Sequence, residues 1–477
     1  MIHENIETLH RSMAAMGLSP AAQRISSSEN QGAIRESLID DLIFTAVFSA
    51  DSAAKSEARR LIHTLAREMG AVSSSIQPLY EAIGRGEVTG FTTPAHNIRA
   101  LTYDVCRALF RAAIKHKVGA FIFEIARSEI GYTEQRPGEY AAAVLAAAIK
   151  EGFKGPVFIQ GDHFQASAKK WKDESGKRAE VKAIESLIDE AIAAEFFNID
   201  IDTSTLVDLD FETRDEQQKE NYEGAAHFTR YIRERQPDGI EISVGGEIGE
   251  VGKHNTSPDE FRAYMDGYRR SLPSGMKGIS KISIQTGTSH GGVPLPDGTI
   301  AKANIDFEVL REISKIGRAE YEIAGSVQHG ASTLPEEVFD RFPQSDAVEI
   351  HLATGFQNMI LDHAAFPFRD EIRKFCFDTA ADERKEDETD EQFVYKTRKK
   401  SLGPFKQRMW ELSEQAKAPI IASLETKFAF LFQKLGVVGT REVVNRHVPI
   451  AKGGGPAYRE VSGGTVAMAT IDPNEGE

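Results

Sequence analysis

Apolar and polar positions change their spacing twice along this chain. Up to about residue 85, apolar residues recur three and four positions apart, which predicts helices. These predicted helices are Asn5–Met16, Ile34–Ser49 and Asp51–Met69. From Val88 onward short apolar runs alternate with segments of helical spacing, and after Gly355 the helical spacing returns. We therefore expect a helical N-terminal extension at 1–85, a central domain at 86–365, and a mostly helical C-terminal extension with an irregular tail at 366–477.

The central section has the rhythm of a (β/α)8 barrel. Its predicted strands are Val88–Thr93, Gly119–Ile125, Val157–Gln160, Asn198–Asp202, Glu241–Gly245, Lys281–Thr286, Tyr321–Val327 and Ala347–Leu352. The predicted helices between them are Thr102–Lys115, Glu139–Lys150, Ala179–Ala194, Glu220–Arg235, Pro258–Ser271, Asp306–Ser314 and Pro335–Phe342. This alternation predicts a TIM barrel with its active site where the strands end. An open doubly wound sheet is the rival, but it gathers functional residues at one crossover point, whereas here polar residues end almost every strand.

Four of the predicted strands end in a side chain that can bind a metal ion. His163, His290 and His329 follow the third, sixth and seventh strands, and Glu247 follows the fifth. In a barrel these strand ends meet at one mouth, so the four side chains can surround a divalent ion. Three histidines with an open fourth position are typical of catalytic zinc, and a carboxylate is a compatible ligand. A single strand-end histidine is more often structural, but three in phase with the barrel favour a metal site.

Small residues follow two of these histidines, in the segments His290-Gly291-Gly292 and His329-Gly330-Ala331-Ser332. Glycine lets backbone N–H groups approach an anion closely, and the serine adds a hydroxyl donor. Barrels often hold phosphate in the loops after strands seven and eight. The candidate phosphate contacts in those loops are Gly330, Ser332, Ala353 and Thr354. Tight turns between a strand and a helix need the same small residues, and the sequence leaves the two interpretations even.

Asp162 stands directly before His163, where it can orient a ligand or exchange a substrate proton. A divalent ion beside a phosphate pocket can polarise a ketone and stabilise the enediolate that forms when a C–C bond breaks. The residues are therefore suited to a metal-dependent aldol cleavage. A metal-dependent hydrolase uses the same ligands with a bound water, so the ligands alone leave both reactions open.

Composition and charge limit the classes of protein to which this chain can belong. The 477 residues are 41% hydrophobic and 27% charged, as in an ordinary globular protein. The net charge of −15 argues against nucleic-acid binding, although a local pocket can still take an anionic substrate. No apolar run approaches 18 residues, and the N-terminus lacks a basic and apolar leader, so we expect a cytoplasmic protein without membrane contact. Cys106 and Cys376 are too few for a disulfide framework.

Six short motifs, in order and at similar spacing, resemble the zinc-dependent class II ketose-bisphosphate aldolases over roughly Val88–Phe356. The segments are Pro94-Ala95-His96-Asn97, Asp162-His163, Gly245-Gly246-Glu247-Ile248-Gly249, Gly287-Thr288-Ser289-His290-Gly291, His329-Gly330-Ala331-Ser332 and Glu349-Ile350-His351-Leu352-Ala353-Thr354. The resemblance implies zinc ligands at His163, His290 and His329, further metal-site residues at Glu247 and Asp202, a proton-handling residue at Asp162 and a substrate contact at Asn97. It also implies phosphate contacts at Gly291, Gly330, Ser332 and Thr354.

Two departures from the family pattern concern the chemistry. The family carries a catalytic glutamate on a mobile loop, and an ungapped count puts Asn255 at that position. The carboxylates that can substitute if the loop is rearranged are Glu250, Asp259 and Glu260. The final strand has Glu349 and His351 where the family has lysine and asparagine, which changes the charge beside the substrate.

The segment Gly161–Trp171 and the motif Ile201-Asp202-Thr203-Ser204 are closer to a relative, the accessory subunit of tagatose-bisphosphate aldolase. We therefore expect either an aldolase that uses zinc or another divalent ion on a phosphorylated ketose, or a non-catalytic accessory subunit of such an enzyme. A zinc hydrolase on the same scaffold is a weaker third option. In each case we expect a homo-oligomer, a dimer or tetramer.

Overall fold

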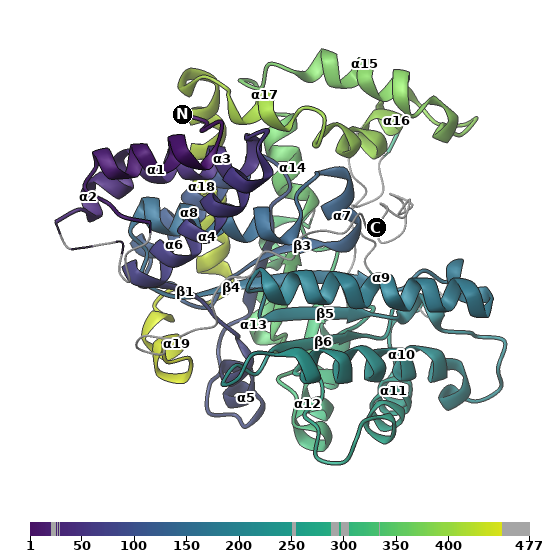
Figure 1. Cartoon of the computed structure of the whole chain (residues 1–477). Coiled ribbons are helices and arrows are strands. Elements are labelled where there is room, and N and C mark those ends of the chain that lie inside the picture. Colours follow the sequence, from purple (N-terminus) through teal and green to yellow (C-terminus); the bar gives the residue numbers. More distant parts are fainter. Residues whose placement is uncertain are drawn as a thin grey trace.

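The computed structural model describes residues 1–20, 25, 27, 29–249, 254–287, 295–296, 305–332 and 334–450. Its centre is a closed barrel of parallel strands with helices around it (Figure 1). In barrel order the strands are β2 (Thr93–Asn97), β3 (Ile122–Ala126), β4 (Gly155–Gln165), β5 (Asn198–Asp202), β6 (Ser243–Glu247), β7 (Lys281–Ser283), β8 (Ser326–Gln328) and β9 (Glu349–Leu352). Each pairs with the next, and β9 pairs with β2, so this barrel has no open edge.

Amphipathic helices cover the outside of the barrel between the strands. They are α6 (Thr102–Lys115), α7 (Arg127–Tyr132), α8 (Pro137–Glu151), α9 (Glu174–Ala193), α10 (Arg214–Arg235), α11 (Pro258–Ser271), α12 (Phe307–Tyr321) and the short α13 (Arg341–Gln344). Several begin at a side-chain cap: Asp173, Thr213, Ser257 and Asp306 each accept a hydrogen bond from a backbone N–H of the first turn. These caps fix where each loop at the mouth of the barrel ends.

The helix that completes the outer layer of the barrel comes late in the sequence. After β9 the chain runs through α14 (Thr354–Leu361), α15 (Arg369–Thr379), α16 (Asp390–Thr397) and α17 (Lys406–Trp410) before α18 (Glu414–Lys434). Phe428 and Phe432 of α18 pack edge-on against His96 of β2, at ring-centroid distances of 5.4 and 5.8 Å. Just beyond α18, Leu435 accepts a hydrogen bond from Thr92 N at 2.9 Å. Thus α18 takes the place of the eighth barrel helix.

The N-terminal helices α1 (Ile6–Ala15), α3 (Ile39–Phe48) and α4 (Ser52–Met69) form a further layer, in which α3 and α4 pack on α8 (Figure 1). After α4 the chain adds a short strand, β1 (Ala71–Ser73), beside the start of β4. Helix α5 (Gln77–Gly84) follows, and the buried hydroxyl of Tyr80 donates a hydrogen bond to Glu349 inside the barrel. This segment therefore closes the end of the barrel where the strands begin, opposite the mouth.

The predicted (β/α)8 barrel is confirmed, with local corrections. Helix α12 continues to Tyr321, beyond the predicted end at Ser314, so the strand predicted over Tyr321–Val327 is only β8. The first strand is β2, not Val88–Thr93, because Val88 and Phe91 pack in the connection from α5 and produce a strand-like pattern there. The strand β1 was not predicted, since three residues carry too little periodicity. The helix predicted over Pro335–Phe342 is a 3-10 turn (Glu336–Val338) followed by α13. None of the helices in the described part of the chain has the length and apolar composition that a membrane crossing requires.

Candidate active site

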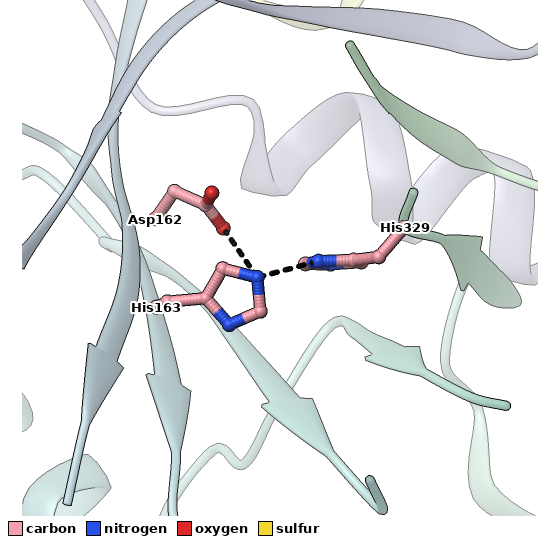
Figure 2. A group of neighbouring side chains, drawn as sticks. All are labelled: Asp162, His163 and His329. Carbon is pink, nitrogen blue, oxygen red and sulfur yellow. Dashed lines mark hydrogen bonds and ion pairs between the residues drawn. The ribbon is translucent and has the colours of Figure 1, made fainter. Parts of the chain in front are cut away.

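A bulge in β4 turns two adjacent side chains toward the same place. Successive residues of a regular strand point to opposite faces, so Asp162 and His163 should diverge. The pairing of β4 with β5 shifts register between Gly161 and Phe164, and His163 has a positive φ of 39°. Figure 2 shows the result: both side chains face the end of β8, where His329 follows. A non-glycine residue in this conformation is strained, and such strain is concentrated at functional sites.

His163 lies at the centre of the site. Its Nε2 atom is 2.6 Å from Nδ1 of His329, and its Nδ1 atom is 3.2 Å from Asp202 Oδ2 and 3.3 Å from Glu247 Oε2. Asp162 Oδ1 lies 3.8 Å from His163 Nε2. Strands β4, β5 and β6 and the loop after β8 thus supply these five side chains, which are mostly buried.

This donor set fits a divalent metal ion. Two groups of side chains each have ligand atoms close enough together to hold an ion, and His163 belongs to both. The first group is Asp162, His163 and His329, and the second is His163, Asp202 and Glu247. Two imidazole nitrogens 2.6 Å apart point at one small space, and Asp162 Oδ1 is buried without an aligned hydrogen-bond donor among the described residues. Imidazole and carboxylate are ligands that zinc accepts. His290, the third predicted histidine, lies outside the described residues.

The carboxylates set the charge on the imidazoles. Burial lowers the pKa of His163, but Asp162, Glu247 and Asp202 outweigh it and raise that pKa well above its usual value. Burial, together with the Asp202 carboxylate, raises the pKa of Glu247 to about 7. Burial also acts to raise the pKa of Asp202, yet hydrogen bonds from His163, Ser204 and Gln165 keep it below its usual value. Without a metal, His163 therefore carries a proton that a bound cation would displace.

Beneath this site the barrel interior is charged instead of apolar. His351 of β9 stacks on His329 with ring centroids 4.0 Å apart, and its Nε2 lies 2.7 Å from Glu349 Oε1. Lys281 of β7 donates to Asp200 Oδ2 at 2.8 Å and to Glu349 Oε1. Gln160 links Glu349 to Glu124 through its amide, at 3.0 and 3.1 Å. TIM barrels usually fill these layers with branched apolar residues, so this network is a distinguishing feature of the chain.

Burial and the neighbouring charges together set the ionisation of this network. Burial lowers the pKa of Lys281, but Asp200 and Glu349 overcome it and raise the pKa to about 12. Burial favours neutral Glu349, yet Lys281 and His351 lower its pKa to about 2. Burial raises the pKa of Asp200 to about 6 and that of Glu124 to about 8. At neutral pH Glu124 is therefore a neutral acid, while Lys281 faces two ionised carboxylates.

A narrow cavity at the mouth connects the metal-binding side chains to the candidate phosphate contacts. Its lining includes Asp162, His163, His329, Gly330, Ser332, His351, Ala353 and Thr354. The Ser332 hydroxyl accepts a hydrogen bond from Gly355 N at 3.1 Å, which joins the loop after β8 to the start of α14. On the opposite wall, the Asn97 amide donates to Glu129 at 2.7 Å and accepts from Arg99 at 3.1 Å. Asn97 is thereby held in the cavity wall.

The candidate metal, proton-transfer and phosphate residues that the structure describes lie at this mouth. His290 and Gly291 lie outside the described residues, as does Glu250 of the loop alternatives. Asn255 donates weakly to Asp306 at 3.4 Å, and Glu260 caps α11 through Ser257, so neither lines the cavity. Asp259 is exposed in the first turn of α11.

Sequence reasoning missed four polar residues of the site: Arg99, Glu124, Glu129 and Lys281. Arg99 and Glu129 form a buried ion pair at 2.5 Å, and Glu124 lines the cavity. Their signal in the sequence is a charged residue within or just after an apolar run, which surface strands also show. A larger hollow of about 660 Å³ lies at the other end of the barrel, between α5 and the loop 272–280. It contains no histidine and none of the predicted metal ligands.

Comparison with known proteins agrees with this geometry. Residues 79–428 match the family described as fructose-bisphosphate aldolase class-II, and the chain belongs to this family. No curated protein sequence matches the chain.

Several solved structures are similar to the chain at low sequence identity. Fructuronate-tagaturonate epimerase from Cohnella laeviribosi is 11% identical, with a TM-score of 0.54, covering 87% of this chain and 91% of its own. A probable tagatose 6 phosphate kinase from Sinorhizobium meliloti is 13% identical, with a TM-score of 0.50, covering 75% and 98%. Fructose-bisphosphate aldolase from Campylobacter jejuni is 16% identical, with a TM-score of 0.45, covering 78% and 96%.

Proposed function

We propose that this protein is a metal-dependent lyase that cleaves or forms a C–C bond in a phosphorylated ketose. The observation that carries the proposal is the convergence of His163, His329 and Asp162 at the mouth of a barrel of the class II aldolase family. His163 and His329 would hold the ion, with Asp202 and Glu247 next to His163 and His290 as the expected third histidine. When bound, zinc or another divalent cation would polarise the substrate ketone and stabilise the enediolate.

Asp162 is suited to the proton transfer. In the cleavage direction a carboxylate removes the proton from the hydroxyl on the carbon beyond the bond that breaks. That carbon becomes an aldehyde, the bond electrons pass to the enediolate, and a proton returned to the enediolate carbon gives the ketone product. His163 and His351 outweigh the effect of burial and lower the pKa of Asp162, so its carboxylate is ionised and ready to accept the proton.

The loops on the other wall are suited to the phosphate. Gly330, Ser332, Ala353 and Thr354 line the same cavity as Asp162, and α14 begins at Thr354 beside the loop after β8, with Gly355 N donating to the Ser332 hydroxyl. The positive end of the helix dipole at the start of a helix stabilises an anion. Gly291, which we propose as a further phosphate contact, lies outside the described residues.

The first test is metal content together with cleavage. We would purify the wild type, His329→Ala and His96→Phe without chelator and determine metals by elemental analysis. We expect about one divalent ion per chain in the wild type and in His96→Phe, whose side chain faces α18, and loss of the ion in His329→Ala. Aldehyde release from ketose phosphates should follow the metal. A wild type that neither carries zinc nor binds it when offered would reject the proposal.

Two alternatives give different results in the same assay. The accessory-subunit alternative predicts no cleavage alone and stable co-purification with a catalytic aldolase. The second alternative is an epimerase. It is supported by the structural similarity to the Cohnella enzyme, which extends over 87% of this chain and so beyond the barrel. An epimerase that breaks and re-forms the same bond would convert one keto sugar into its epimer without releasing aldehyde to a trapping reagent. We further propose a cytoplasmic homo-oligomer, to be tested by its mass in solution.

A further inference from the structure

Among the described residues, few polar groups lie close enough to Asp162 to fix its orientation. Its Oδ1 atom is buried, and the structure places two nitrogens near it: His351 Nδ1 at 3.3 Å and His163 Nε2 at 3.8 Å. The second of these is a nitrogen that a metal would use. Because Asp162, His163 and His329 have ligand atoms close enough to share one ion, a small rotation would make Asp162 a ligand. A carboxylate bound to the metal is a poor base for a substrate hydroxyl.

His351 is held far more firmly than Asp162. Its Nε2 lies 2.7 Å from Glu349 Oε1, and its ring stacks at 20° on His329. Its Nδ1 lies 3.0 Å from Glu124 Oε2 without being aligned as a hydrogen bond. Glu349 is in turn held by Lys281, Gln160 and Tyr80. The imidazole is thus the upper end of a rigid network that reaches to the closed end of the barrel. Such rigid support is what orients a catalytic group within a fraction of an ångström.

We propose that His351 is a positioning residue that, through Nδ1, holds the Asp162 carboxylate at the substrate and away from the metal ligands His163 and His329. This role rests on the proposed function, and His351 stands where the sequence departs from the family pattern. Nδ1 is not aligned as a hydrogen bond with Asp162 in this structure. Catalytic hydrogen bonds are often long without substrate and shorten in the complex.

Two substitutions separate the two ring nitrogens. His351→Asn keeps an N–H donor near the position of Nδ1, and His351→Gln keeps one near the position of Nε2, while both remove the ring. If Nδ1 positions Asp162, His351→Asn should retain kcat within about tenfold, and His351→Gln should lose about 100-fold, each with little change in KM. His96→Phe, a buried histidine on the outer side of β2, is the control for loss of an imidazole. Equal losses of kcat in the Asn and Gln variants would overturn the proposal.

Zinc affinity gives a readout that does not depend on activity. In His351→Gln, Asp162 is released and joins the ligand set, so zinc titrated into the metal-free protein should bind about tenfold more tightly than to the wild type. A merely structural role predicts weaker binding, and that result would overturn the proposal. A crystal structure of metal-free His351→Gln should show the Asp162 carboxylate turned toward His163. An unmoved carboxylate would contradict the proposal.

A second variant covers the case in which His351→Gln does not fold. Glu124→Gln keeps the shape of the side chain that shares Nδ1 with Asp162, and zinc should bind to it within about threefold of the wild-type affinity, because Nδ1 still holds Asp162. Zinc binding about tenfold tighter would show that Asp162 is held through Glu124 instead, and would overturn the proposal. If the wild type cleaves no ketose phosphate, the proposed function fails. The zinc titration and the crystal structure still decide the role of His351.

Discussion

At the scale of single residues, the unusual feature is the buried charge below the metal-binding side chains. Lys281 is 1% exposed and is paired with Asp200 and Glu349 on two other strands. A buried pair adds little to stability compared with apolar packing, but removing one partner leaves an uncompensated charge. The barrel therefore depends on keeping this set complete.

Replacing Lys281 tests that dependence. Lys281→Met should lower the free energy of unfolding by about 3–5 kcal/mol, because two carboxylates lose their cation. The double variant Lys281→Met, Glu349→Gln should be less destabilised than the sum of the two single variants, by about 1–3 kcal/mol. Urea unfolding measures all three. Lys374→Met, which removes an exposed ion pair with Asp378, is the control and should cost less than about 1 kcal/mol. Additive effects of the buried pair would contradict the expectation.

His96 should make the fold sensitive to acid. Its Nδ1 lies 3.2 Å from Ile122 O, its Nε2 is buried without a partner among the described residues, and burial lowers its pKa from 6.5 to about 3. Between those values the unfolded chain binds a proton that the folded chain does not. The stability linked to His96 is therefore complete above pH 6.5 and is lost as the pH falls toward 3.

The variant His96→Phe should remove this sensitivity. Between pH 6 and pH 4 the wild type should lose about 1.4 kcal/mol more per pH unit than the variant does. Urea unfolding at pH 7, 6, 5 and 4 gives the two slopes. Parallel slopes would show that His96 is not the source of the acid sensitivity.

Residue types and their order predicted most of the side chains that meet at the candidate site. The others could not be predicted, because they lie further from the ends of their strands. His163, His329, Asp162 and Glu247 could be found because each ends a predicted strand. Glu124 and Lys281 lie within strands. Only the pairing register of the barrel strands shows that both side chains belong to the same network inside the barrel. Sequence spacing does not contain that register.

At the scale of elements, the β4 bulge is what brings Asp162 and His163 together. The bulge needs Gly161, since a Cβ atom there would lie 2.5 Å from the buried ring of Phe164. The strand itself was predicted from its apolar run, but the bulge was not, because it arises from pairing with β5.

Gly161→Ala should therefore disturb both stability and the site. We expect a loss of about 1–3 kcal/mol on urea unfolding from overpacking, and weaker zinc binding because His163 is displaced. The matched control is Gly32→Ala, where a Cβ atom meets nothing within 4 Å. Unchanged zinc affinity in Gly161→Ala would show that the bulge does not set the position of His163.

At the scale of the whole molecule, the barrel and the C-terminal helices share one core. Phe430 of α18 contacts Phe339, before α13, at a centroid distance of 6.5 Å, and Glu425 of α18 pairs with Arg111 of α6 at 2.7 Å, so α18 is packed on both neighbouring parts of the barrel. The boundary predicted at residue 365 remains a prediction. The packing suggests that a chain cut there lacks the cover of β2 and β9.

Truncation tests this view. A chain that ends at Ser413, before α18, should fail to give a cooperative thermal transition by circular dichroism, because the outer face of β2 loses the apolar cover of Phe428 and Phe432 and is exposed to water. A chain that ends at Ile450 keeps every described contact and should melt like the full protein. A cooperative transition in the shorter chain would show that the barrel folds without α18.

The late position of α18 also has a consequence for synthesis of the protein. Strand β2 leaves the ribosome more than 300 residues before the helix that covers it. At about 5–20 residues per second the nascent chain then leaves the outer face of β2 uncovered for on the order of tens of seconds. During that time a chaperone that binds extended apolar segments competes with aggregation. We expect the yield of folded protein in the cell to depend on such a chaperone more strongly than the stability of the finished barrel would suggest.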